Sequence, residues 1–100
     1  MVINEGIVHY KIAPNEELTL SQIERALQAA NSNKYYAKFF TDKFFIQVNF
    51  NSDGTIAVSS NIICSQFLQD MYRMTKFGWN YTRVKNFIYT WMQLHRKSLY

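Results

Sequence analysis

The 100-residue sequence predicts one small α+β domain, residues 1–100, in which an antiparallel sheet of three or four strands packs against helices. Two observations predict this class. Apolar and polar residues alternate within residues 1–60, which is typical of half-buried strands, and apolar residues recur at helical spacing within residues 61–100. We expect the element order β-α-β-β-β-α-α, with one N-terminal helix and a C-terminal helical hairpin packed on the sheet.

The first strand is expected over Ile7–Ala13, where apolar and polar side chains alternate. Pro14 ends this strand, because proline cannot donate a hydrogen bond to a neighbouring strand. Two pairs, Thr19 with Gln22 and Ser21 with Glu24, then have the spacing of a capping box, in which each side chain bonds to the backbone N–H of the other residue. We therefore expect a helix over about Ser21–Ala30.

The segment Lys34–Phe40 is aromatic and is compatible with a strand or with an extension of the helix. We favour a strand, because aromatic residues are enriched in strands. Phe44–Phe50 is a clearer strand, since every second residue is apolar. Asn51–Gly54 has the composition of a hairpin turn, with glycine where a positive φ is needed, and Thr55–Ser59 returns as the next strand.

Two helices are expected after the strands. Ile62–Lys76 carries its apolar residues on one helical face, and Ser60 or Asn61 is the expected cap. Gly78 stands where this helix should stop, since glycine adopts a positive φ without a Cβ clash. Asn80 is a favoured cap for the last helix, and so short a connection predicts a helical hairpin.

Positive charge is concentrated in the C-terminal part of the chain. Residues 1–60 hold five basic and six acidic residues, a net charge of −1. Residues 61–100 hold six basic residues and one acid, a net charge of +5. This asymmetry favours a polyanionic or acidic partner. Our first hypothesis is therefore a non-enzymatic domain that binds nucleic acid, or a nucleoprotein complex, through the helical hairpin.

The candidate nucleic-acid contacts are the cations of the hairpin and one tyrosine able to stack on a base. They are Arg73, Lys76, Arg83, Lys85, Tyr89, Arg96 and Lys97. The spacing around Gly78 is compatible with a helix-turn-helix or with an ordinary αα-hairpin. Met74 favours the ordinary hairpin, because it stands where close helix packing needs a small residue. The cations are also compatible with a solvated helix face.

The second hypothesis is a protein-interaction module, such as a small regulator, an inhibitor or a homodimer subunit. The chain has more aromatic residues than one small core can hold, and protein interfaces are enriched in them. The candidate interface residues are Tyr35, Tyr36, Phe45, Tyr72 and Tyr81. A short chain with this content of Asn and Lys would also suit a phage or plasmid product.

The segment Lys43–Phe50 is similar to the aromatic strand motif of RNA-recognition modules, in which bases stack on sheet aromatics. It lacks the glycine of that motif, and two helices follow the hairpin where that fold needs a helix and then a strand. Phe44 and Phe50 are therefore expected in the core.

The sequence shows no catalytic signature, so we expect no enzyme, no metal and no cofactor. His9, His95 and Cys64 are the groups suited to zinc or nucleophilic chemistry, and no two of them have ligand spacing. A single cysteine forbids an internal disulfide and favours a reducing compartment, so we expect a cytoplasmic protein. Met1–Gly6 lacks the apolar core of a signal peptide, and no apolar run approaches a membrane span.

Overall fold

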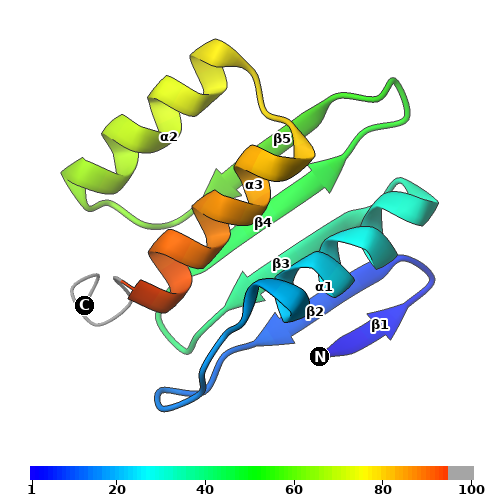
Figure 1. The fold of residues 1–100 in the computed structure, drawn as a ribbon, viewed down its shortest axis with the longest axis horizontal. Coiled ribbons are helices and arrows are strands. Elements are labelled where there is room, and N and C mark those ends of the chain that lie inside the picture. Colours follow the sequence, from blue (N-terminus) through cyan, green and yellow to red (C-terminus); the bar gives the residue numbers. More distant parts are fainter. Residues whose placement is uncertain (95–100) are drawn as a thin grey trace.

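The computed structural model describes residues 1–94 of the chain. Five strands form one sheet in the order β1-β2-β3-β4-β5 (Figure 1). The strands are β1 (Val2–Asn4), β2 (Ile7–Lys11), β3 (Tyr36–Phe40), β4 (Phe45–Phe50) and β5 (Ile56–Ser60). The predicted α+β class is confirmed, but the sheet differs from the prediction in having an additional strand and one parallel pair.

The pair β2–β3 is parallel, so the expectation of a fully antiparallel sheet was wrong here. The helix between the two strands, α1 (Leu20–Asn33), carries the chain back along the sheet, and the next strand therefore runs in the same direction as the first. The β3–β4 and β4–β5 pairs are antiparallel, as predicted. The carboxyl ends of β2 and β3 consequently lie at the same edge of the sheet.

The additional strand, β1, pairs antiparallel with β2 across a two-residue turn of Glu5 and Gly6. Both turn residues have a positive φ, 54° and 86°, as a favoured type of two-residue hairpin turn requires. A Cβ atom on Gly6 would lie 2.4 Å from the Cβ of Asn33, so the turn packs directly against the end of α1. Three residues are too few to show alternation, which explains why β1 was not predicted.

The helix α1 begins at the first of the two predicted capping boxes, that of Thr19 and Gln22. The Thr19 hydroxyl accepts the backbone N–H of Gln22 at 3.2 Å, and the Gln22 side chain accepts the backbone N–H of Thr19 at 2.8 Å. The helix continues three residues beyond the predicted Ala30 and stops at Lys34, whose φ is 57°. Its buried residues are Ile23, Ala26, Leu27 and Ala30, which repeat at helical spacing and pack toward the sheet.

The favoured strand within Lys34–Phe40 is confirmed as β3. Alternation along the strands buries one set of side chains under the helices: Val8, Tyr10, Ala37, Phe39, Ile46, Val48 and Phe50. Phe44, just before β4, is also buried, so the core positions predicted for Phe44 and Phe50 are confirmed. The turn Asn51–Gly54 is confirmed as well, with Gly54 at a φ of 90° and its N–H donating to the Asn51 carbonyl at 3.1 Å.

The helix α2 (Ser65–Phe77) begins three residues later than predicted, and the expected cap at Ser60 or Asn61 was wrong. Asn61 is used elsewhere, because its side-chain oxygen accepts the backbone N–H of Phe45 at 2.8 Å. The later start also moves Ile63 off the buried helix face, and its side chain is 88% exposed.

The connection between the last helices follows the prediction. Gly78 ends α2 with a φ of 97°, and the Asn80 side chain caps α3 (Tyr81–Ile88) by accepting a backbone N–H at 2.9 Å. Trp79 lies between them and packs edge-to-face on Phe87, with 5.1 Å between ring centres. The two helices form a helical hairpin (Figure 1).

The chain after α3 does not continue as a regular α-helix. Tyr89–Leu94 winds as a π-helix, η1, although the sequence predicted α-helical spacing to the C-terminal end. This wider winding changes which side chains share a face. Trp91 and Met92 are both buried as a result, and Tyr89 packs partly against the core instead of projecting into solvent.

The helices α1 and α3 lie side by side on one face of the sheet. The helix α2 lies on the side of α3 that is away from α1 (Figure 1). Phe67 is the one buried residue of α2, and its ring centre lies 5.2 Å from those of both Phe87 and Trp91. The buried apolar side chains form one cluster between the helices and the sheet. Within residues 1–94, no helix combines the length and apolarity needed to cross a membrane.

Candidate nucleic-acid interface

The described cations of the helical hairpin lie against different parts of the molecule. Arg73 bonds one carboxylate oxygen of Asp70 at 2.7 Å, and the other oxygen accepts the indole N–H of Trp91 at 2.9 Å. Arg83 donates to the Gly78 carbonyl at 2.7 Å, at the connection between α2 and α3. Each of these two guanidinium groups therefore supports the local structure of the hairpin.

The other described residues of the predicted set, Lys76, Lys85 and Tyr89, also lie in different surroundings. The Lys85 Nζ faces α1 and lies 3.8 Å from a carboxylate oxygen of Glu24, and Tyr89 is half-buried against the core. Lys76 is exposed near the end of α2. Arg73, Arg83 and Lys85 thus each contact a different partner. Three residues considered from the sequence lie outside the described residues: His95, Arg96 and Lys97.

The five predicted interface aromatics lie in four places. Tyr35 and Tyr72 are exposed. Tyr81 is used within the fold, where its hydroxyl donates to a backbone carbonyl of α1 at 2.9 Å, and burial together with a neighbouring carboxylate raises its pKa. Tyr36 and Phe45 are half-buried on the face of the sheet that points away from α1 and α3. Tyr36 and Phe45 are thus two predicted interface residues on neighbouring strands of the same sheet face.

We call the sheet face that points away from α1 and α3 the open face. Cross-strand partners share a face, so the strand register identifies its members. They are Val2, Asn4, Ile7, His9, Lys11, Tyr36, Lys38, Phe40, Phe45, Gln47, Asn49, Ala57 and Ser59. No member is acidic, whereas two are lysines and one is a histidine. Every charged side chain at a strand position of this face is therefore basic.

Lys38 lies over the aromatic rings of the open face. Its Nζ lies 4.9 Å from the centre of the Phe45 ring and 5.5 Å from the centre of the Phe40 ring. Phe40 and Phe45 are direct cross-strand partners. A cation within about 6 Å of a ring centre is attracted to the electron-rich ring face. The contact therefore shows that these ring faces are within reach of a charged group on the open face.

His9 extends the aromatic cluster across the parallel pair. Its ring centre lies 5.7 Å from that of Tyr36 and 6.2 Å from that of Phe40. The His9 Nε2 and the Tyr36 hydroxyl also share a hydrogen bond of 3.0 Å, which orients both rings. Rings from β2, β3 and β4 thus lie together on the open face. We call His9, Tyr36, Phe40 and Phe45 the aromatic strip.

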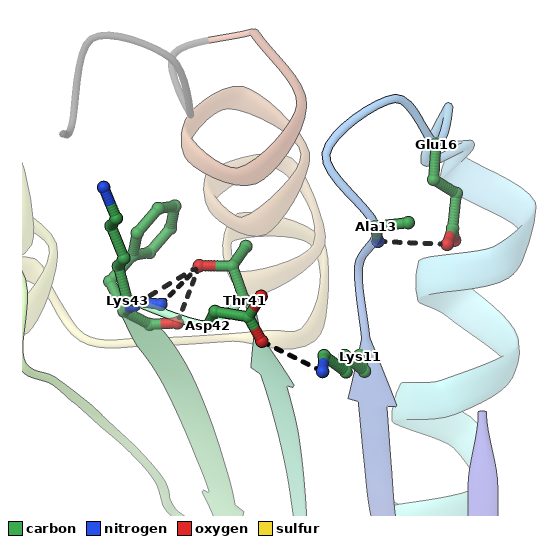
Figure 2. Close-up of polar contacts among 7 residues, drawn as sticks. Lys11, Ala13, Glu16, Thr41, Asp42 and Lys43 are labelled. Carbon is green, nitrogen blue, oxygen red and sulfur yellow. Dashed lines mark hydrogen bonds and ion pairs between the residues drawn. The ribbon is translucent and has the colours of Figure 1, made fainter.

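The β3–β4 turn lies between Phe40 and Phe45 of the aromatic strip. Its polar contacts are drawn in Figure 2. The Thr41 hydroxyl oxygen accepts the backbone N–H groups of Lys43 at 3.2 Å and Phe44 at 3.3 Å, and so holds the turn. Asp42 faces Lys11 across the sheet edge, with 2.9 Å between the carboxylate and the ammonium. Both side chains are exposed, so this ion pair contributes at most about 1 kcal/mol and can exchange for another anion.

Two hollows meet at this turn and share Thr41, Asp42 and Lys43. A hollow of about 160 Å³ opens toward the aromatic strip and is also lined by Lys38, Phe40, Phe44, Phe45 and Asn61. A hollow of about 540 Å³ lies at the carboxyl ends of β2 and β3 and is also lined by Lys11, Ile12, Ala13 and Pro14. In sheets with parallel strands, the crevice outside the carboxyl ends is a usual place for ligands. The open face therefore continues into a concave, partly basic edge.

The loop after β2 is fixed by Glu16. One carboxylate oxygen accepts the backbone N–H of Ala13 at 3.3 Å (Figure 2), and the other accepts the Tyr10 hydroxyl at 3.0 Å. Burial, followed by the hydrogen bond and the charge of Glu16, raises the pKa of Tyr10 to about 12. This network ties the loop beside the larger hollow to the core.

Sequence reasoning missed four residues of this site as a group: His9, Lys11, Lys38 and Phe40. A usable signal was present for two of them, because period-two alternation through β3 puts Tyr36, Lys38 and Phe40 on one face. The ambiguity between strand and helix for this segment concealed it. The placement of β2 beside β3 had no local signal, because it depends on the crossover by α1.

Outside the open face, Cys64 lines a separate hollow together with Asp70, Arg73 and Trp91. Cys64 is a partly buried free thiol that precedes α2 without a side-chain capping bond. Among residues 1–94, no cluster of three or more His, Cys, Asp or Glu side chains is arranged to hold a metal ion. No protein family, curated protein or solved structure matches this chain.

Proposed function

We propose that this protein binds nucleic acid through the open face of its sheet. The observation that carries the proposal is the aromatic strip with Lys38 lying over two of its rings. Lys and Arg side chains supply most of the affinity of proteins for nucleic acid by neutralising phosphates, and aromatic rings add base stacking. The absence of acidic residues from the strand positions of this face removes the repulsion that a polyanion would otherwise meet.

Lys38 on the open face differs from two of the four described hairpin cations in having no ion pair within residues 1–94. Among the residues that the structure describes, Lys38 has no carboxylate partner, so its ammonium can reach a phosphate without first leaving an ion pair. Arg73 and Lys85, by contrast, already pair with Asp70 and Glu24. A phosphate contact at either residue would compete with the existing ion pair.

The test is binding of the full chain to a labelled random single strand and a labelled random duplex, followed by fluorescence anisotropy at two salt concentrations. We expect micromolar or tighter binding at low salt that weakens steeply with added salt, because each neutralised phosphate releases counterions. For a single strand, the logarithmic slope should change by about −0.7 for each phosphate contacted. Absence of binding at low salt, or binding that does not respond to salt, would contradict the proposal.

A second candidate function is self-association or binding of another protein through α2. Tyr72 and Phe77 on this helix are each 71% exposed, and Ile63 just before it is 88% exposed. Large apolar side chains exposed in this way are typical of interfaces. Light scattering over a range of concentrations tests the homodimer form. A monomer at every concentration would count against it.

A further inference from the structure

We infer that the open face takes unpaired bases, so that its preferred ligand is a single strand of DNA or RNA and not a duplex. This inference rests on the proposed nucleic-acid function and specifies its substrate class. Three features of the open face carry it: the accessible ring faces, the position of these rings inside a five-stranded sheet, and the amide side chains beside them.

The ring faces can be used only by a base that is not paired and stacked. The Lys38 Nζ lies 4.9 Å from the ring centre of Phe45 and 5.5 Å from that of Phe40. A group on the open face can therefore reach the flat faces of both rings. Within a duplex, the flat faces of the bases are covered by their neighbours, and only the base edges are reachable in the grooves. Unpaired bases expose their flat faces, and aromatic side chains bind them by stacking.

The shape of the open face also disfavours a duplex. Reading of the major groove requires an element that enters it, such as a helix or a two-stranded ribbon. The aromatic strip occupies strand positions inside a five-stranded sheet, and Tyr36, Phe40 and Phe45 are half-buried among their neighbours. These rings cannot project into a groove. A duplex would therefore contact only the lysines and would gain nothing from the aromatic strip.

Amide side chains continue the same row of β4. Gln47 and Asn49 follow Phe45 on the open face, and the Gln47 amide nitrogen donates to the Asn49 side-chain oxygen at 3.1 Å. Each amide carries both donors and an acceptor. The hydrogen-bonding edge of a base is available to such groups when the base is unpaired. A nucleotide stacked on Phe45 would thus meet hydrogen-bonding groups two and four residues further along β4, at Gln47 and Asn49.

Lys38 links stacking to phosphate binding. In the free protein its ammonium lies over the Phe40 and Phe45 rings. A base stacking on Phe45 takes that place, and the long lysine stem lets the ammonium turn to a phosphate of the bound strand. The ring and the charge are therefore used by the same ligand, which a polyanion without bases cannot do.

The experiment measures anisotropy of a labelled oligothymidine of about 12 nucleotides, within the usual range of single-strand binding sites. A duplex with the same number of phosphates and inorganic polyphosphate serve as unlabelled competitors. We expect the single strand to bind more tightly than the duplex, and polyphosphate to compete poorly. Phe45→Leu should weaken single-strand binding about 5- to 150-fold, the range for loss of one stacked base.

Matched variants separate stacking from folding. Phe45→Tyr keeps a ring and should retain single-strand affinity, whereas Tyr72→Leu removes an exposed ring from α2 and should leave it unchanged. Circular dichroism checks that each variant is folded. Phe40→Leu makes the same comparison at the cross-strand partner if Phe45→Leu does not fold.

Each contrary outcome has a distinct meaning. Duplex binding as tight as single-strand binding, or a folded Phe45→Leu variant with unchanged affinity, would overturn this inference and leave the proposed function standing. Failure of both nucleic acids to bind would overturn the two together. A wild-type dimer that Phe45→Leu dissociates in light scattering would assign the open face to a second copy of the chain, and would also overturn the inference.

Discussion

Tyr10 makes the fold sensitive to alkaline pH. Burial, with the hydrogen bond and charge of Glu16, raises its pKa to about 12 from the ordinary 10.0. The neutral phenol therefore stabilises the folded state fully below pH 10, and this contribution is lost as the pH rises from 10 to about 12. We expect urea unfolding near pH 11 to give a smaller free energy of unfolding than unfolding below pH 10.

The matched control is Tyr10→Phe, which keeps the ring in the core and removes the ionisable group. Its stability should decline less across the same pH interval. An equal decline in the variant and the wild type would assign the effect to other groups, such as Tyr81, whose pKa is also raised.

Single side chains could be placed from the sequence where the start of their strand or helix, and so the face of each residue, was predicted correctly. Alternation through β4 placed Phe44 and Phe50 in the core, and both are buried. The same reasoning failed for Ile63, because the helix was expected to begin before it. The start of α2 depends on Asn61, which bonds the backbone of Phe45 instead of capping the helix. Such a bond between distant residues leaves no periodic trace in the sequence.

Among the helices α1, α2 and α3, α2 buries the fewest side chains. Phe67 is its single buried residue, and Met71 and Met74 are only partly buried. We expect Phe67→Ala to destabilise the protein by up to about 3–5 kcal/mol, the usual cost of removing a buried Phe. Because little else holds the helix, the loss should appear in hydrogen exchange as faster exchange of the α2 amides, with the sheet amides still protected.

Phe77→Ala on the same helix is the control, since Phe77 is 71% exposed and should leave the exchange pattern nearly unchanged. If Phe67→Ala instead accelerated exchange equally throughout the sheet and α2, the helix would be a cooperative part of the core, contrary to this account.

Elements with local signals were predictable, and those set by long-range packing were not. The capping box at Thr19, the stop at Gly78 and the cap at Asn80 all lie where their residue types require. The parallel β2–β3 pair and the π-helix after α3 follow from how the chain is packed. For the π-helix, the burial of both Trp91 and Met92 replaces the α-helical spacing that the sequence suggested.

At the scale of the whole molecule, a segment's net charge does not determine which charges share a surface. The C-terminal segment holds the excess positive charge, yet Arg73, Arg83 and Lys85 there contact separate partners. The N-terminal segment is slightly acidic overall, but its acids lie outside the strand positions of the open face. The crossover by α1 then brings Lys11 beside Phe40, which no local pattern could predict.

The most direct test of the open face as the binding surface compares two variants of equal net charge, Lys38→Gln on the open face and Lys76→Gln on α2. Each removes one positive charge from an otherwise identical chain. Lys38→Gln is expected to weaken single-strand binding at low salt and to reduce the logarithmic salt slope by about 0.7, whereas Lys76→Gln should behave as the wild type. Weaker binding by Lys76→Gln, with Lys38→Gln unchanged, would contradict the open-face account and return the site to the helical hairpin.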